Sequence, residues 1–131
     1  MSYSDKYLEQ YWPERPNNPD MWQDNLELLH AYFGAAEAIF SEEGQRIDAL
    51  DFSTGPCLAP LMATMACIST VQLSDYTESN RAEIVSSRIE YWSEYARELV
   101  RMFPESALSI EELLAGTDRL RKERLPLDVD L

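Results

Sequence analysis

The stretch IDALDFSTGPCLAPLMA, residues 47–63, decides the fold of the chain. Its first part, IDALDF (47–52), is a short apolar run bounded by glycines, and it predicts a β-strand. The next part contains Gly55 between polar and proline residues, which predicts a turn. Because proline suits the first turn of a helix, Pro60 predicts a helix that starts directly after this turn. We therefore expect strand, turn and helix in that order.

More elements of the same kind follow along the chain. VQLSD (71–75) predicts a second strand, and residues 78–103 have the apolar spacing of one long helix. Ser109 with Glu112 forms a capping box that opens another helix. PLDVDL (126–131) predicts a third strand. Strands that alternate with helices favour a parallel sheet with right-handed crossovers, so we expect an α/β fold with about three parallel strands.

Residues 1–46 are expected to form a helical cap segment in front of this sheet. One face of a short first helix carries mostly aromatic residues, namely Tyr7, Leu8, Tyr11 and Trp12. Three prolines predict an irregular connector over residues 13–20. Asp24, with Glu27 three positions later, predicts the N-cap of a second helix that ends near Gly44.

The charge of the chain excludes some classes of partner. The 131 residues contain 24 Asp and Glu against 11 Lys and Arg, which gives a formal net charge of −13. Nucleic acids and anionic membranes repel so acidic a surface, and we expect neither as the main partner. The charge is compatible with a small cationic substrate or a basic protein partner. The hydrophobic content of 45% is that of a chain that buries a core.

The cysteines and the N-terminus indicate the expected compartment. Cys57 and Cys67, with the single histidine His30, have neither zinc-ligand spacing nor the pattern of a disulfide framework. We expect reduced thiols, no metal, and a structural or surface role for His30 rather than a catalytic one. Residues 1–10 lack the apolar region of a secretory signal, and no run approaches the ~20 apolar residues of a membrane span. A soluble, cytoplasmic protein is the expectation.

The ends of the first two strands are a candidate ligand site. Asp51 ends the first strand, Gly55 lies in the turn, and the following helix offers free backbone N–H groups. Asp75 ends the second strand, at the position where nucleotide-binding α/β folds hydrogen-bond a ribose. The same three residues also fit a turn glycine with two strand-end aspartates, so both interpretations stay open.

Longer motifs add to this pattern. LDFSTGPCLAPLMA followed by VQLSDYTESNRAEI resembles the S-adenosylmethionine-dependent methyltransferases of the nicotinamide, phenylethanolamine and indolethylamine N-methyltransferase family. In that family a strand ending in D-x-G-x-G-P precedes one ending in T/S-D-Y, with an Asn five residues after the Asp. KYLEQYW (6–12) resembles the N-terminal aromatic segment of the family, and LDV (127–129) resembles the end of its third strand. The resemblance implies that residues 47–131 form a truncated Rossmann-like half-domain that binds S-adenosyl-L-methionine.

The resemblance assigns several residues to the nucleoside part of this cofactor. It implies that Asp75 binds the ribose hydroxyls and that Asn80 hydrogen-bonds around the ribose. Tyr76 would lie along the adenine face, where its ring can stack. Asp128 and the Val129 backbone would face the adenine edge. The structural alternative for Tyr76 is a turn aromatic.

Other matching residues would surround the methionine part and the acceptor. Asp51, Ser53 and Gly55 would shape the loop beside the methionine portion. Ser53 replaces the first family glycine, which adds a Cβ where the backbone approaches the ligand. Ala59 stands where the family often has a loop tyrosine. These two departures place cofactor affinity in question.

The N-terminal aromatics would close the site. The resemblance implies that Tyr7 covers cofactor and substrate together with Trp12, and that Tyr11 lies between them. Tyr7 and Tyr11 would act as walls of the catalytic pocket rather than as proton-transfer residues. Trp12 takes a position where the family more often has tyrosine, and its structural alternative is a hydrophobic staple.

Family members continue with further strands that complete the sheet and wall the substrate pocket. We therefore expect the cofactor-binding subunit of a split small-molecule methyltransferase, with N-methyl transfer as the reaction. A second polypeptide would complete the sheet, or a second copy would join through the open edge of the first strand. The alternative is a non-catalytic, degenerate methyltransferase-like interaction or regulatory protein. A fragment of a longer chain is a third possibility.

Overall fold

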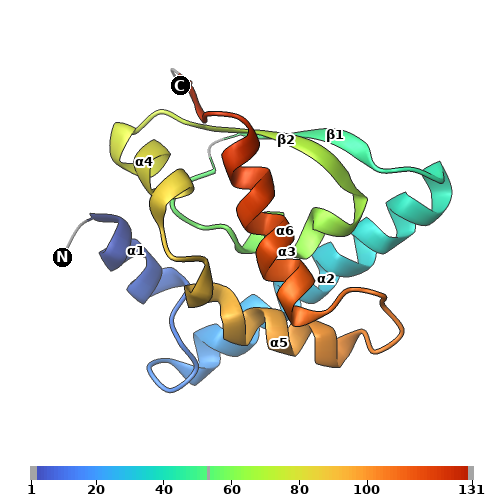
Figure 1. The fold of residues 1–131 in the computed structure, drawn as a ribbon. Coiled ribbons are helices and arrows are strands. Elements are labelled where there is room, and N and C mark those ends of the chain that lie inside the picture. Colours follow the sequence, from blue (N-terminus) through green and yellow to red (C-terminus); the bar gives the residue numbers. More distant parts are fainter. Residues whose placement is uncertain (1–2, 53, 130–131) are drawn as a thin grey trace.

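Helices and a short parallel sheet make up a mixed α/β structure, compatible with part of a Rossmann-like fold (Figure 1). The computed structural model describes residues 3–52 and 54–129. The elements in chain order are α1 (Tyr3–Tyr11), α2 (Pro19–Glu43), β1 (Ile47–Asp51), α3 (Ala59–Thr64), the 3₁₀ helix η1 (Met65–Cys67), β2 (Ile68–Asp75), α4 (Glu78–Ser86), the 3₁₀ helix η2 (Ile89–Trp92), α5 (Ser93–Met102), α6 (Ile110–Glu123) and β3 (Leu127–Asp128).

The sheet has the expected parallel pairing, in the order β1-β2-β3. Asp51 lies opposite Leu73 and Asp75 lies opposite Asp128, so the strands end near one another. The third strand is shorter than the predicted range 126–131, because only two of its residues pair with β2; residues 130 and 131 lie outside the described part. In the described chain β1 pairs with β2 alone, which leaves its other edge without a strand.

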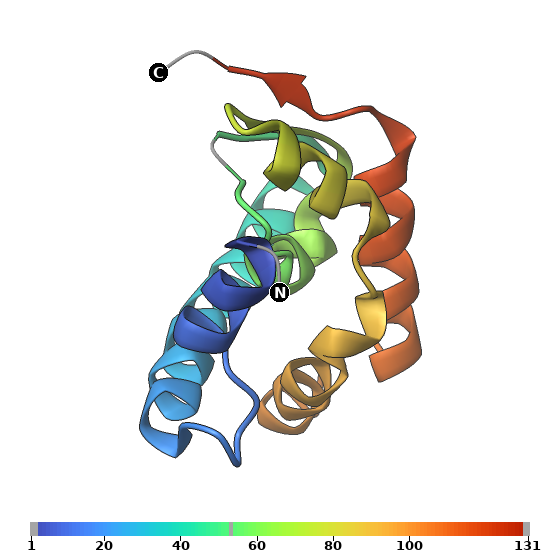
Figure 2. The same ribbon diagram turned by 90° about the vertical axis from the view of Figure 1, so that its left-hand side faces the viewer.

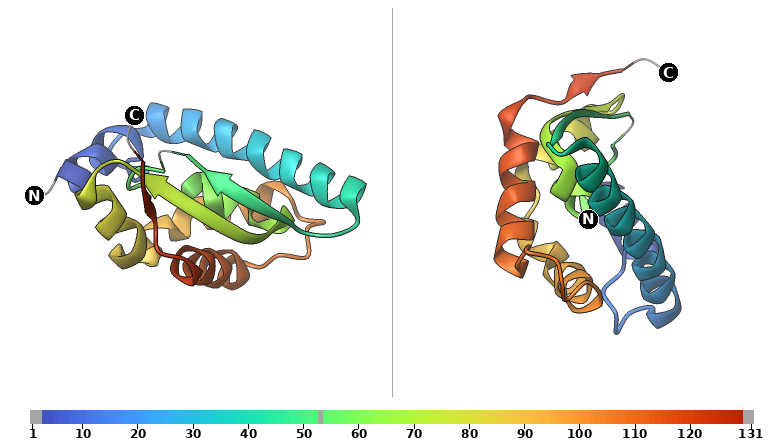
Figure 3. Two further views of the ribbon diagram at one scale, coloured as in Figure 1. Left: turned by 90° about the horizontal axis from the view of Figure 1, so that it is seen from above. Right: turned by 90° about the vertical axis from the view of Figure 1, so that its right-hand side faces the viewer.

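The helices cover one face of the sheet. In Figure 1, α2, α3, α5 and α6 lie beneath β1 and β2, and Figure 2 shows no described helix above them. Val71 and Leu73 of β2 are buried against these helices, whereas Leu50 of β1 is 66% exposed. Seen from above in Figure 3, α2 runs along the β1 side of the sheet and α6 along the β2 side. One face of the sheet and the free edge of β1 are therefore left uncovered by the described chain.

Helix α2 begins earlier than the predicted start at Asp24. The side chain of Asn18 accepts a hydrogen bond from the Met21 N–H (3.1 Å), and Pro19 takes the first helical position. Proline is favourable there because its missing N–H would have no helical partner, so this proline begins a helix instead of extending the connector. The predicted end is confirmed: Gly44 is left-handed, with φ of 70°, and its N–H donates to the Phe40 carbonyl (2.9 Å).

The prediction of one long helix over residues 78–103 is wrong. The chain leaves the helix at Ser87, which is extended, and then continues through η2 into α5. Buried Arg121 of α6 explains the break, since its guanidinium donates to the Ile84 carbonyl (3.2 Å) and to Ser87 Oγ (3.0 Å). A tertiary donor thus satisfies a carbonyl at the end of α4, which local helical spacing does not reveal.

The core lies between the sheet and the helices. The predicted capping box opens α6, where Ser109 Oγ accepts from the Glu112 N–H (3.1 Å). Met62 and Met65 are buried in this core, where their flexible side chains fill irregular space. The largest fully buried side chains come from helices α2 to α6, from η2, from β2 and from the residue before α3: Trp92, Tyr95, Phe33, Leu29, Leu58, Met62, Leu73, Ile84, Leu99, Leu113, Leu120 and Thr117.

The two cysteines are not joined in a disulfide. Cys57 and Cys67 are free and buried, and burial raises the pKa of both thiols. Among residues 3–52 and 54–129, no group of His, Cys, Asp and Glu side chains is arranged to hold a metal ion. None of the helices described combines the length and the apolar character needed to cross a bilayer.

Candidate functional site

The ends of β1 and β2 are tied together by hydrogen bonds. Ser74 Oγ donates to the Asp51 carbonyl (2.8 Å), and the Thr54 N–H donates to the Ser74 carbonyl (2.6 Å). The Ser74 N–H in turn donates to Thr54 Oγ1 (3.2 Å). These bonds hold the turn after β1 against the end of β2, so the two predicted halves of the site are adjacent.

Asp75 is at the centre of this arrangement, and only 3% of its surface is exposed. Oδ2 of its carboxylate accepts from the Gly55 N–H (2.7 Å). Oδ1 accepts from the N–H and the hydroxyl of Thr77 (2.9 and 2.7 Å) and from Asn80 Nδ2 (3.2 Å). Gly55 has a φ of 65°, a left-handed conformation that favours glycine. One carboxylate therefore joins the turn after β1 to the start of α4.

The surroundings of Asp75 keep it ionised. Burial raises the pKa of its carboxyl, but the donors on Thr77, Gly55 and Asn80 together outweigh burial and hold the pKa below its ordinary value. Asn80 is itself buried and also donates to Thr77 Oγ1 (2.9 Å). Tyr76, by contrast, is 61% exposed directly beside this network. A buried anion thus lies next to an accessible aromatic ring.

The end of β3 completes the same region. The Val129 N–H donates to the Asp75 carbonyl (3.4 Å), and Arg81 Nη1 donates to that carbonyl as well (2.9 Å). Arg81 also forms an ion pair with Asp128 (3.1 Å). Asp128 and Val129 are therefore neighbours of Asp75, while Asp128 is engaged by a cation of this chain.

The three N-terminal aromatics differ in their surroundings. Tyr7 and Tyr11 lie with ring centroids 5.0 Å apart, and Tyr11 is exposed. Trp12 is only 8% exposed and packs edge-on against Trp92 (5.9 Å) and Tyr95 (5.8 Å). Trp12 is therefore a member of the core cluster, packed against residues that are distant in the sequence.

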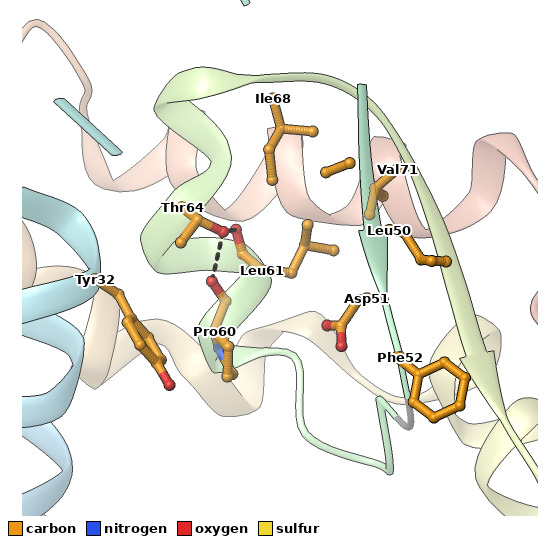
Figure 4. A pocket seen from close by; sticks show the side chains of 10 residues that line it. Tyr32, Leu50, Asp51, Phe52, Pro60, Leu61, Thr64, Ile68 and Val71 are labelled. Carbon is orange, nitrogen blue, oxygen red and sulfur yellow. Dashed lines mark hydrogen bonds between the residues drawn. The ribbon is translucent and has the colours of Figure 1, made fainter. Parts of the chain in front are cut away.

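Asp51 lies on the other side of the turn, in a pocket of about 240 Å³ (Figure 4). The pocket is bounded by β1, by Pro60, Leu61 and Thr64 of α3, and by Tyr32 of α2. Burial raises the pKa of Asp51, and a hydrogen bond with Thr54 opposes this only in part. A carboxyl beside apolar walls and an aromatic ring can attract a cationic group.

Some predicted residues and features fall outside this arrangement. Ser53 lies outside the described residues. Ala59 is buried at the start of α3. Among the basic residues at the end of α6, Arg121 is buried, and Lys122 pairs with Asp118 (3.0 Å).

Tyr32 was not identified from the sequence as a residue of the site. A signal was present, because Tyr32 belongs to a second set of apolar residues on α2 with helical spacing, next to the set that forms the core. One buried face per helix accounts for the first set, and the sequence alone does not show what lies beside the second.

Comparisons with known proteins add no relative: no family model matches the chain, and neither curated proteins nor solved structures gave a significant match. We therefore infer the function from the residues and contacts of the chain itself.

Proposed function

We propose that this chain is the S-adenosyl-L-methionine-binding component of a small-molecule methyltransferase, with a second polypeptide supplying the remaining strands. The observation that carries the proposal is the contact between Asp75 at the end of β2 and Gly55 in the turn after β1. Ligands of parallel α/β folds bind at this edge of the sheet, and an acidic side chain there accepts ribose hydroxyls.

The residues around Asp75 fit the nucleoside part of the cofactor. Oδ1 already accepts three hydrogen bonds, whereas Oδ2 accepts one, so Oδ2 retains a lone pair for a ribose hydroxyl. Tyr76 offers an exposed ring for adenine. Oδ2 can accept one ribose hydroxyl beside the Gly55 N–H, so the contact that joins the two strand ends is kept.

The residues around Asp51 fit the positively charged methionine part of the cofactor. Asp51 borders a pocket with Tyr32 and Phe52, and a carboxylate with aromatic neighbours favours positive charge. S-adenosylmethionine supplies an already activated methyl group, so the protein has to hold the acceptor in line and exclude water. In the proposal Tyr7 and Tyr11 form walls of the acceptor pocket, and the acceptor is a small amine.

Isothermal titration with S-adenosylmethionine tests the proposal. We expect binding by the wild-type chain, and a loss of about tenfold in affinity in Tyr76→Ala, because a stacked base contributes on the order of 1–3 kcal/mol. Tyr76 is exposed, so this variant leaves the core unchanged. Phe40→Ala, which removes another exposed aromatic ring at the far end of α2, is the matched control and should bind as the wild type does. No heat of binding, or equal affinity in Tyr76→Ala, would overturn the assignment.

One observation favours a second candidate, a non-catalytic interaction protein. The Asp75 carboxylate accepts four hydrogen bonds, from Gly55, Thr77 and Asn80, and the residue is almost completely buried. A purely structural link between β1, β2 and α4 would have the same contacts. In that case Asp75→Asn lowers only the stability of the chain, and S-adenosylmethionine gives no heat with any variant.

A further inference from the structure

Helix α2 carries two apolar stripes, and only one of them is covered. The inner stripe is buried in the core and consists of Leu26, Leu29, Phe33 and Ala36. The second, which we call the outer stripe, is exposed and consists of Leu28, Tyr32, Ala35 and Ile39. Its members follow one another at intervals of four, three and four residues, so they share one face of the helix.

One member of the outer stripe, Tyr32, lies beside the end of β1. Tyr32 lines the same pocket as Leu50, Asp51 and Phe52, and Figure 4 shows its ring directed from α2 into that pocket. Figure 3 shows α2 running along the β1 side of the sheet. Leu50 and Phe52 are both exposed, so the apolar surface continues from the helix onto the strand end.

We propose that this surface, the free edge of β1 with the outer stripe of α2, docks a β-strand of a basic partner polypeptide. The edge of β1 offers backbone N–H and carbonyl groups in the pattern that a further strand can pair with. The outer stripe would lie beneath such a strand, and alternate apolar side chains of the strand would pack on it. Ala35 lies at the centre of the stripe and leaves room for them.

Charge selects a basic partner. Acidic residues border the outer stripe at both ends, with Asp24 and Glu27 near its start and Glu42 near its end, and Asp48 lies on β1. None of these four takes part in an ion pair within the part of the chain that the structure describes. A second copy would bring its own charge of −13 to this surface, whereas Lys and Arg on a partner strand would be attracted.

This inference names the partner surface of the proposed methyltransferase component, and in that respect it rests on the proposed function. Its test uses no cofactor. A chain that binds the strand but not S-adenosylmethionine would fail only the proposed function, and the reverse result would fail only this inference.

The probe is a short synthetic peptide in which Lys alternates with Val, compared with a peptide in which Glu replaces Lys. Binding is followed by chemical shifts of the backbone amides and by size-exclusion chromatography with light scattering. Ala35→Lys places bulk and positive charge in the outer stripe. Gln23→Lys adds the same charge to an exposed position of α2 outside the stripe, and it serves as the control.

We expect the Lys–Val peptide to shift amides of β1 and α2, and the Glu–Val peptide to leave them unchanged. Ala35→Lys should weaken binding of the peptide about tenfold or more, because substitutions at the centre of an interface have the largest effects. Gln23→Lys should have little effect. Equal weakening by both variants would show unspecific charge attraction and would overturn the inference, as would shifts confined to other elements. A stable dimer of the chain that Ala35→Lys dissociates would also overturn it, because the occupant would then be a second copy.

Discussion

Two aspartates end neighbouring parallel strands, and their surroundings are opposite. Asp75, at the end of β2, accepts hydrogen bonds from three residues, and its pKa lies below the ordinary value. Asp51, at the end of β1, lies beside an apolar pocket at the free edge of the sheet, and burial raises its pKa. In the part of the chain that the structure describes, the polar groups around Asp75 therefore bond to one another, whereas one edge of β1 has no neighbouring strand.

The same difference divides helix α2, and it provides the largest expected effect. Phe33 of the inner stripe is buried against Phe103, with ring centroids 4.4 Å apart, whereas neighbouring Tyr32 belongs to the outer stripe. Phe33→Ala should lower the free energy of unfolding by about 3–5 kcal/mol, because it leaves a cavity in the core. Tyr32→Ala should change it by less than about 1 kcal/mol. Urea denaturation of both variants provides the measurement, and similar losses would mean that the outer stripe is already packed in the free chain.

The second prediction concerns the network at the end of β2. Asp75→Asn should lower the free energy of unfolding by about 2–4 kcal/mol, because donors of Gly55 and Thr77 lose a buried charged acceptor. The control is Asp48→Asn, an exposed strand aspartate that accepts one hydrogen bond from Thr70, and it should cost less than about 1 kcal/mol. Chemical denaturation at pH 7 compares them. Equal effects would show that the network around Asp75 contributes little to stability.

A smaller expected effect is on the pH dependence of stability, to which Asp75 and Asp51 contribute with opposite sign. The pKa of Asp75 is lowered in the folded chain. The ionised carboxylate therefore stabilises the folded state fully above the unfolded pKa of about 3.9, and this stabilisation is lost as the pH falls through the folded pKa. The pKa of Asp51 is raised in the folded chain, so the effect of pH is opposite. Protonation of Asp51 as the pH falls increases the free energy of unfolding.

Unfolding by urea between pH 3 and pH 7 measures this difference. Asp75→Asn should remove part of the acid loss of stability, and Asp51→Asn should stabilise the chain at pH 7 by removing a charge from an apolar site. Identical pH profiles of the wild type and both variants would contradict the opposite shifts of the two carboxyls.

The sequence was sufficient to predict a mixed α/β chain with three parallel strands. The strands containing Asp51 and Asp75 are short apolar runs that end in turns, and such local patterns survive in the folded chain. The helix end at Gly44 and the cap at Ser109 were predictable for the same reason, since each depends on residues within one helical turn.

Features that depend on distant residues were not predictable. The break at Ser87 needs Arg121, which is far away in the sequence, and helical spacing alone continues through it. The burial of Trp12 depends on Trp92 and Tyr95 in the same way. At the candidate site, the position of Asp75 followed from the strand pattern, but its bond to the Gly55 N–H required the tertiary arrangement of two turns.

Amide hydrogen exchange of the monomeric chain, residue by residue, tests most directly whether β1 is the incomplete side of the sheet. We expect slow exchange at the amides through which β1 and β2 pair with each other, and fast exchange at the alternate amides of β1 whose N–H groups point to the free edge. Addition of the Lys–Val peptide should slow those β1 amides and leave β2 unchanged. Uniform protection of β1 in the monomer, equal to that of β2, would contradict the account.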